Sequence, residues 1–168
     1  MQRLFYFRVM TITIREYRSN DLTELTRLFN ETVAEGNSLL DEKAVTADQL
    51  SARIEHQEAA TCVALIGDTL CGAYLVKQNL KGRGSHVANA TYIVNRNYRG
   101  RGIGYALGKH SIERAKVLGF KAMQFNSVVS SNTTAIRLWE RLGFKRLATI
   151  PDGFRLPMVL LLIRMSSI

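Results

Sequence analysis

The sequence is poor in the residues that mark several protein classes. Its 168 residues include only two cysteines, two prolines, one tryptophan and three histidines. Two cysteines are too few for the disulfide bonds that stabilise a small disulfide-rich fold. No apolar run approaches the roughly 20 residues of a membrane-spanning helix. The histidines show no Cys/His/carboxylate spacing typical of a metal site. We therefore expect no metal, no disulfide and no association with a membrane.

Acidic residues are scarce relative to basic ones. The chain has 23 Lys and Arg against 14 Asp and Glu, a formal net charge of +9. Such an excess raises nucleic-acid binding as a function, because phosphate contacts dominate that affinity. The sequence has no zinc-finger spacing, basic leucine zipper or RNP-like aromatic strand, however. Many basic residues instead surround a glycine-rich segment within residues 96–121, so we expect an anionic cofactor rather than nucleic acid.

Length and composition predict one domain in a reducing compartment. A chain of this length can bury a single core. We expect residues 1–9 to be an N-terminal extension and residues 10–168 to form the domain, because the opening apolar stretch is too short for a secretory signal. Cys62 and Cys71 are expected to be free thiols in the core, which favours a cytoplasmic location.

Hydrophobic periodicity predicts alternating strands and helices. Strands are expected at residues 11–15, 61–66, 69–77, 86–94, 121–128, 145–150 and 158–164, and helices at residues 20–34, 46–57, 102–118 and 132–142. Thr46 and Gln49 have the spacing of a capping box, and Gly67 with Asp68 suits a two-residue hairpin turn. This order predicts an α+β fold. The apolar run at residues 158–163 is expected either to be a buried strand or to form a homodimer interface.

A glycine-rich turn between a strand and a helix is the most specific feature of the chain. The turn consists of Arg99, Gly100, Arg101, Gly102, Ile103 and Gly104. Glycine allows backbone N–H groups to approach an anion closely, and the first turn of the following helix adds unpaired N–H groups and a positive dipole end. The turn is therefore expected to bind a phosphorylated cofactor.

Two common glycine-rich templates do not fit this turn. A nucleotide P-loop needs four residues between its first Gly and its Gly-Lys-Ser/Thr, whereas the segment from Gly104 to Lys109 is one residue short and continues with His110. The dinucleotide fingerprint needs a third glycine where this chain has Leu107. Spacing therefore argues against both nucleotide-binding templates.

The turn does match the R/Q-x-x-G-x-G/A signature, so the chain resembles the GNAT superfamily of N-acetyltransferases. A second segment resembles that family's N-x-x-A-x-x-L-Y-x-x-x-G-F helix through Asn132, Ala135, Leu138, Gly143 and Phe144. The resemblance implies the GNAT fold, a central mixed and mostly antiparallel sheet with helices on both faces and a splayed parallel strand pair at the acyl-CoA site. It also implies acetyl-CoA as co-substrate and direct acetyl transfer to an amine in a ternary complex.

The resemblance also assigns roles to particular residues. It implies that backbone groups of Ile93 and Val94 hold the pantetheine and the acetyl carbonyl, with an N–H near Val94 polarising the oxygen that becomes anionic. The pyrophosphate would be held by backbone amides of the turn, with Arg96, Arg99 and Arg101 as charge partners. Asn132 would both cap its helix and contact the cofactor.

Two catalytic groups common in the family are missing. The strand at residues 86–94 has no Glu to act as a base, and Trp139 stands where the family has Tyr. Indole is no acid near neutral pH, so the proton donor for the departing thiolate is left open between water, backbone groups, Tyr92 and Thr133. His86 is a candidate base, with exposure to solvent as its alternative reading.

Asparagines stand on the two strands expected to splay apart. We predict that Asn89 and Asn126 orient the acceptor, the alternative being that both are satisfied sheet residues. With Asn132 and Trp139 they resemble the subgroup that acetylates L-azetidine-2-carboxylate and related imino acids. A small amine, amino acid or imino acid is therefore the expected acceptor. A protein N-terminus or lysine, or a non-catalytic acyl-CoA-binding module, are the alternatives.

Overall fold

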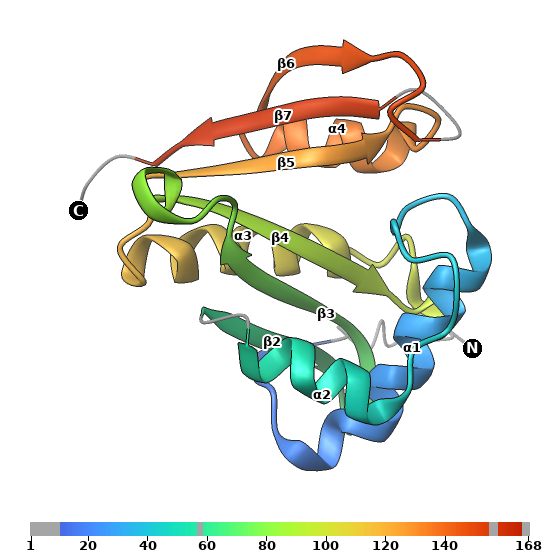
Figure 1. Cartoon of the computed structure of the whole chain (residues 1–168). Coiled ribbons are helices and arrows are strands. Elements are labelled where there is room, and N and C mark those ends of the chain that lie inside the picture. The colour runs from blue at the N-terminus through green and yellow to red at the C-terminus, as the bar shows by residue number, and fades with distance from the viewer. Residues whose placement is uncertain (1–10, 57–58, 155–157, 166–168) are drawn as a thin grey trace, which may run out of the picture.

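A seven-stranded mixed sheet forms the centre of the protein (Figure 1). This computed structural model describes residues 11–56, 59–154 and 158–165, so the expected extension at residues 1–9 lies outside the described residues. In order across the sheet, the strands are β1 (Ile12–Glu16), β2 (Ala60–Ile66), β3 (Thr69–Gln78), β4 (Val87–Val94), β5 (Ala122–Val129), β7 (Met158–Arg164) and β6 (Lys145–Ile150). The β4–β5 pair is parallel and the other neighbours are antiparallel, which confirms the α+β prediction.

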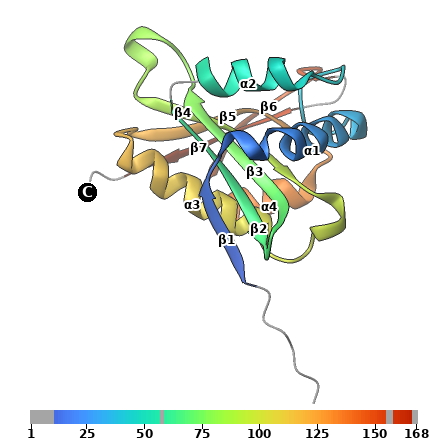
Figure 2. The same ribbon diagram turned by 90° about the horizontal axis from the view of Figure 1, so that it is seen from below.

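Helices cover both faces of the sheet (Figure 2). They are α1 (Leu22–Glu35), α2 (Ala47–His56), α3 (Ile103–Val117) and α4 (Thr133–Arg141). On one face, Leu25 and Leu28 of α1 and Leu50 of α2 pack on the sheet. On the other, α3 and α4 pack through a larger core that includes Leu107 and Trp139. Successive strand residues point to opposite faces, so β2, β3 and β4 contribute to both cores, whereas β5 and β7 contribute to the core under α3 and α4. Among the described residues, no helix is long and apolar enough to cross a membrane.

β4 and β5 separate soon after they begin. The parallel ladder joins only Val87 to Ala122 and Ala88 to Met123, and Figure 1 shows the two strands diverging toward their C-terminal ends. On its other edge β5 pairs with β7 from Ala122 to Val129, with a register irregularity between Phe125 and Val128. The two edges that face each other beyond Ala88 and Met123 are named the split here, and they match the predicted splayed pair.

Several local predictions are confirmed at the level of single contacts. The N–H of Gln49 donates to Thr46 Oγ1 at 3.2 Å and the N–H of Thr46 donates to Gln49 Oε1 at 2.9 Å, which completes the capping box. Cys62 and Cys71 are free and buried, and burial raises the pKa of both thiols. The run at residues 158–163 belongs to β7, an interior strand between β5 and β6, as the buried-strand alternative expects.

Gly72 sets the distance between β3 and the start of α3. A Cβ at this position would lie 2.8 Å from the Ile93 carbonyl oxygen and 3.1 Å from Leu107 Cδ1. We expect Gly72→Ala to lower the free energy of unfolding by about 1–3 kcal/mol, the usual cost of overpacking. Urea unfolding measures the change, with Thr69→Ala at an exposed position of the same strand as the control. Equal stability of Gly72→Ala and wild type would contradict this close approach.

Candidate active site

The glycine loop, residues 99–104, opens α3 in a conformation that only glycine adopts easily. Gly100 and Gly102 have φ angles of 76° and 82°, in the left-handed region, and Gly102 is the N-cap of α3. A Cβ at either position would meet no heavy atom within 4 Å, so both face open space. The first N–H groups of α3 have no partner within the helix, and Gly102 supplies no side-chain cap. These features together make a site for an anion.

The arginine side chains of this loop already have protein partners. Arg99 makes two hydrogen bonds to the Glu35 carboxylate, at 2.8 and 2.9 Å, and its Nε donates to the Val94 carbonyl at 3.3 Å. Arg101 lies over the Tyr98 ring at 4.9 Å and donates to the Asn97 carbonyl at 3.3 Å. Arg99, the expected charge partner of the pyrophosphate, is therefore paired with the carboxylate of Glu35 at the end of α1.

The register of β3 and β4 decides which backbone groups face the split. The N–H of Asn79 donates to the Val87 carbonyl and the N–H of Asn95 donates to the Cys71 carbonyl, both at 2.8 Å. Because residues alternate between the two edges of an antiparallel strand, the odd-numbered residues of β4 bond to β3. Val94 therefore faces the split, as do Ala90 and Tyr92.

Ile93 has the opposite orientation from the one expected. Its backbone pairs with Ala73 of β3, and its side chain, 1% exposed, packs in the core under α1 and α2. The Ile93 carbonyl also lies close to Gly72, inside the sheet. The N–H and carbonyl of Ile93 thus face β3, whereas the backbone groups of Tyr92 face the split.

Four carboxamides form a hydrogen-bonded cluster, the carboxamide network, where the β4–β5 ladder ends. Asn89 Nδ2 donates to Asn79 Oδ1 at 3.2 Å, and Asn126 Nδ2 donates to the same oxygen at 2.7 Å. Gln124 Nε2 donates to Asn126 Oδ1 at 2.8 Å, and Asn89 Oδ1 accepts from the N–H of Ala90 at 2.8 Å. The structure thus brings the predicted Asn89 and Asn126 together. It adds Asn79 and Gln124, which no motif in the sequence pointed to.

Other residues singled out in the sequence lie elsewhere. Tyr92 shares a 2.6 Å hydrogen bond with Ser111, and burial raises the pKa of its phenol, so it is a poor proton donor for a thiolate. Trp139 is a core residue whose ring lies 4.6 Å from that of Tyr92. His86 is exposed and precedes β4 at the closed end of the ladder, which argues against a catalytic base there. Asn132 caps α4, since its Oδ1 accepts from the N–H of Ala135 at 3.1 Å.

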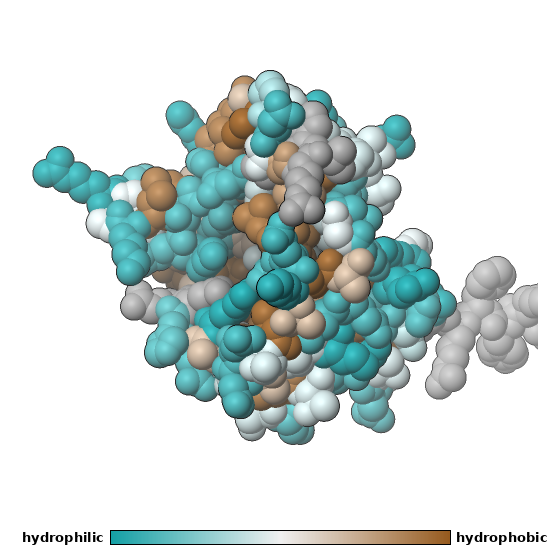
Figure 3. Space-filling model, turned by 45° about the vertical axis from the view of Figure 1, so that its right-hand side comes forward, coloured by the Kyte–Doolittle hydropathy of each residue, from teal (hydrophilic) through white to brown (hydrophobic). Residues whose placement is uncertain are grey.

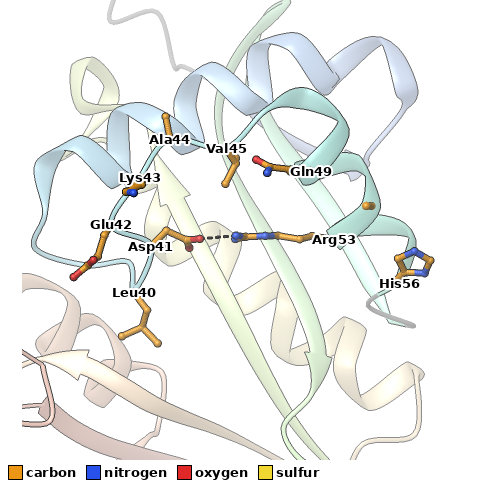
Figure 4. A pocket seen from close by; sticks show the side chains of 10 residues that line it. Leu40, Asp41, Glu42, Lys43, Ala44, Val45, Gln49, Arg53 and His56 are labelled. Atoms are coloured by element: carbon orange, nitrogen blue, oxygen red, sulfur yellow. Dashed lines mark hydrogen bonds and ion pairs between the residues drawn. The ribbon is translucent and has the colours of Figure 1, made fainter.

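A groove of about 940 Å³ lies between α2 and the segment that connects it to α1 (Figure 4). Asp41 and Arg53 form an ion pair at 2.6 Å across it, and Leu40 at its end is 63% exposed. Figure 3 shows one face of the molecule as mostly hydrophilic, with hydrophobic patches among the polar side chains. Among the described residues, no group of three or more His, Cys, Asp or Glu is arranged to hold a metal ion.

The site thus combines a glycine loop at the start of α3 with a parallel strand pair that splits. A comparison of the chain with known protein families shows where this combination belongs. Residues 19–144 match the model of the family described as "Acetyltransferase (GNAT) family". The chain belongs to the GNAT acetyltransferases. The matched range contains the glycine loop, the split and α4, so every part of the candidate site except the last strands falls within it.

Two fungal proteins are similar in sequence to about half of the chain. N-acetyltransferase aca1 of Schizosaccharomyces pombe is 42% identical over 88 residues, which make up 52% of this chain and 42% of that protein. Protein SPT10 of Saccharomyces cerevisiae is 35% identical over 91 residues, or 51% of this chain and 14% of that protein. The chain thus spans less than half the length of these relatives.

A solved structure agrees over nearly its whole length. A GCN5-related N-acetyltransferase from Kribbella flavida superimposes with a TM-score of 0.86 and is 30% identical in sequence, covering 92% of this chain and 98% of that one.

The Glu35–Arg99 pair leads to a testable consequence for anion binding. Glu35→Gln would remove a negative charge beside the glycine loop and leave Arg99 uncompensated. We expect a polyanion such as CoA to bind about two- to fivefold more tightly at low salt, with the gain shrinking as salt screens the charge. Calorimetry at two salt concentrations measures this. Glu31→Gln is the control, because Glu31 pairs with Arg27 on the same helix. Unchanged or weaker binding by Glu35→Gln at low salt would contradict the expectation.

Proposed function

We propose that this chain transfers the acetyl group of acetyl-CoA to the amine of a small amino acid or imino acid, by direct attack in a ternary complex. The observation that carries the proposal is the arrangement along the split. An anion site lies at the C-terminal end of β4, and a polar cluster lies where the ladder closes. Acetyl-CoA suits this arrangement, because its pyrophosphate and its reactive thioester lie at opposite ends of the pantetheine arm.

In this proposal the cofactor lies along the split with its pyrophosphate at the glycine loop. The path along β4 from Asn89 to Val94 is about 17 Å at the usual rise per strand residue, which suits an extended pantetheine arm. N–H groups on the split edge, at Tyr92 and Val94, would bind the arm and polarise the acetyl oxygen as it becomes anionic. Two proteins with this fold, yncA of Salmonella typhimurium and Pat of Sinorhizobium meliloti, were solved with acetyl-CoA.

The carboxamide network favours an acceptor with a carboxylate. Three of its four oxygens are engaged, since Asn79 Oδ1 accepts twice and the oxygens of Asn89 and Asn126 accept once each. Its remaining groups are mainly N–H donors, including both hydrogens on Asn79 Nδ2. Lys77 adds a positive charge opposite Asn89 on β3. An excess of donors matches an anion, which agrees with the resemblance to the imino-acid subgroup.

The transfer itself needs little from acidic or basic side chains. The amine, as its free base, attacks the acetyl carbon, the C–S bond breaks, and the nitrogen loses a proton to solvent. The sulfur leaves as a thiolate, which is a good leaving group because thiol pKa values lie near 8.5, and water protonates it. This chain's contribution is then to position two reactants and to stabilise an oxyanion, so the missing Glu and Tyr do not prevent catalysis.

A panel of amines tests the proposal. Purified protein is incubated with acetyl-CoA and amino acids, imino acids, simple amines, or peptides with a free N-terminus or lysine, and thiol release is measured. We expect turnover with carboxylate-bearing small amines. Turnover only with peptides would favour the protein-acetyltransferase alternative, and CoA binding without turnover would favour an acyl-CoA-binding module.

The proposal also includes a location and an assembly state. The two free core thiols suit the reducing cytoplasm. A homodimer would use β6, an edge strand whose Leu147 and Ile150 are 52% and 41% exposed. Size-exclusion chromatography with light scattering tests the dimer, and a monomeric mass at micromolar concentration would refute it.

A further inference from the structure

Asn79 lies where three strands meet. It directly follows β3, and its backbone N–H donates to the Val87 carbonyl of β4 at 2.8 Å, so its main chain continues the β3–β4 pairing. Its side-chain oxygen accepts from Asn89 on β4 and from Asn126 on β5. The β4–β5 backbone ladder ends at Ala88 and Met123. One carboxamide oxygen therefore joins the two strands immediately beyond their last backbone pairing.

A single backbone group determines the orientation of this network. The Ala90 N–H is a fixed donor and bonds to Asn89 Oδ1, so the amide nitrogen of Asn89 must point the other way, toward Asn79. Asn79 must then present its oxygen, which leaves its own NH2 group unbonded within the described residues. Asn126 meets the same oxygen through its nitrogen, and its oxygen turns to Gln124 Nε2. No carboxamide in the cluster can flip without breaking a hydrogen bond.

Stability alone gives little reason for this arrangement. Asn126 is exposed, and Asn79 and Asn89 are only half-buried. Exposed amides satisfy their hydrogen bonds with water at little cost, so holding three of them in one orientation adds little to folding. Orienting N–H groups in advance matters to a ligand that must bind between β4 and β5, because a preorganised donor needs no rearrangement at the moment of reaction.

We propose that Asn79 is a positioning residue, which holds Asn89 and Asn126 so that their free N–H groups face the acceptor from both sides of the split. Its effect on transfer rests on the proposed function, whereas its effect on the two side chains does not. Asn79 also offers its own NH2 group on the same side. The acceptor is thus held through donors on β4, on β5 and on the residue that directly follows β3.

Asn79→Ala tests the proposal by two independent readouts. The first is the 15N-correlated NMR spectrum, in which the side-chain NH2 signals of Asn89 and Asn126 should shift because both lose their acceptor. The second is steady-state kinetics with the best amine of the panel, where we expect kcat/KM for the acceptor to fall on the order of 100-fold with CoA affinity unchanged. Gln78→Ala is the control, since Gln78 is the preceding residue and has no side-chain partner in the described part of the chain.

A double-mutant cycle separates positioning from a general structural effect. If Asn79 acts through Asn89, then Asn79→Ala in an Asn89→Ala background should lower kcat/KM by only a few-fold further. Asn79→Asp keeps an accepting oxygen, so the Asn89 and Asn126 signals should stay near their wild-type positions. Its added charge should raise KM for acceptors with a carboxylate, and this variant also serves if Asn79→Ala does not fold.

Two results would overturn the proposal. One is wild-type NH2 signals for Asn89 and Asn126 in folded Asn79→Ala, and the other is a wild-type kcat/KM for the acceptor in that variant. Fully additive losses in the cycle would also count against positioning through Asn89. If the wild-type protein acetylated no amine, the proposed function would fall, and the NH2 signals would still decide whether Asn79 holds the two side chains.

Discussion

Gly102→Asp is expected to lower the affinity for CoA on the order of 100-fold while the protein stays folded. The position is the N-cap of α3 with φ of 82°, and an added Cβ meets no neighbour within 4 Å. Asp tolerates the left-handed region better than most residues, so the fold is affected little. Its carboxylate would stand among the N–H groups that we assign to the pyrophosphate. Two like charges a few ångströms apart near a surface repel by several kcal/mol.

Gly102→Asn is the matched control for this change. Asn has the same shape and the same tolerance for a positive φ but no charge, so we expect a loss of only a few-fold. Gly104 is a less suitable position, because a Cβ there would lie 3.1 Å from Leu138 Cδ1 on α4 and would disturb packing as well as binding. Calorimetric titration of CoA measures all variants. Equal CoA affinity for Gly102→Asp and Gly102→Asn would contradict the assignment of the glycine loop to the cofactor site.

Asn89→Ala is expected to keep the affinity for CoA and to reduce acetyl transfer on the order of 100-fold. Asn89 is the β4 member of the carboxamide network, and its loss would leave the acceptor without a donor on that side of the split. Misplacing a nucleophile by about 1 Å can cost this much in rate. The measurements are CoA calorimetry and the thiol-release assay. A wild-type rate with every acceptor would make Asn89 an ordinary sheet residue.

Asn89→Asp distinguishes the classes of acceptor. The substituted side chain can still accept from the Ala90 N–H, so its position is preserved while its donor is lost and a negative charge appears. Amino and imino acids should then react more slowly, because two carboxylates repel. A simple amine should react as fast or faster, since the carboxylate can take up its proton. Parallel changes in both classes would contradict recognition of a carboxylate by this network.

Features that depend on only a few neighbouring residues could be predicted from the sequence. The capping box at Thr46, the N-cap at Asn132 and the glycine loop all depend on backbone geometry within one turn, and the structure has each of them at the predicted position. Strand and helix periods were readable for the same reason. Each predicted element in the described residues is present, with small shifts such as β4 beginning at Val87 rather than His86.

Contacts between distant segments could not be read in this way. The partner of Arg99 is Glu35, 64 residues earlier, and no motif in the sequence around either residue predicts this ion pair. Ile93 was assigned to the split because the family resemblance indicates only which segment of the strand contacts the cofactor. The β3–β4 register decides, for each residue, which edge of the strand its backbone groups face. A shift of one residue exchanges the two edges, so only the register could assign Tyr92 and Val94 to the split.

By itself, the sequence determined the α+β class, the order of the elements, the glycine-rich turn at residues 99–104 and the resemblance to GNAT acetyltransferases, because these follow from local periodicity and short motifs. Only the tertiary structure decided which side chains meet. The meeting of Asn79, Asn89 and Asn126 requires the antiparallel β3–β4 register and the short parallel β4–β5 ladder at once. Both are sheet pairings between separate segments, set by the packing of the two cores rather than by the residues next to each asparagine.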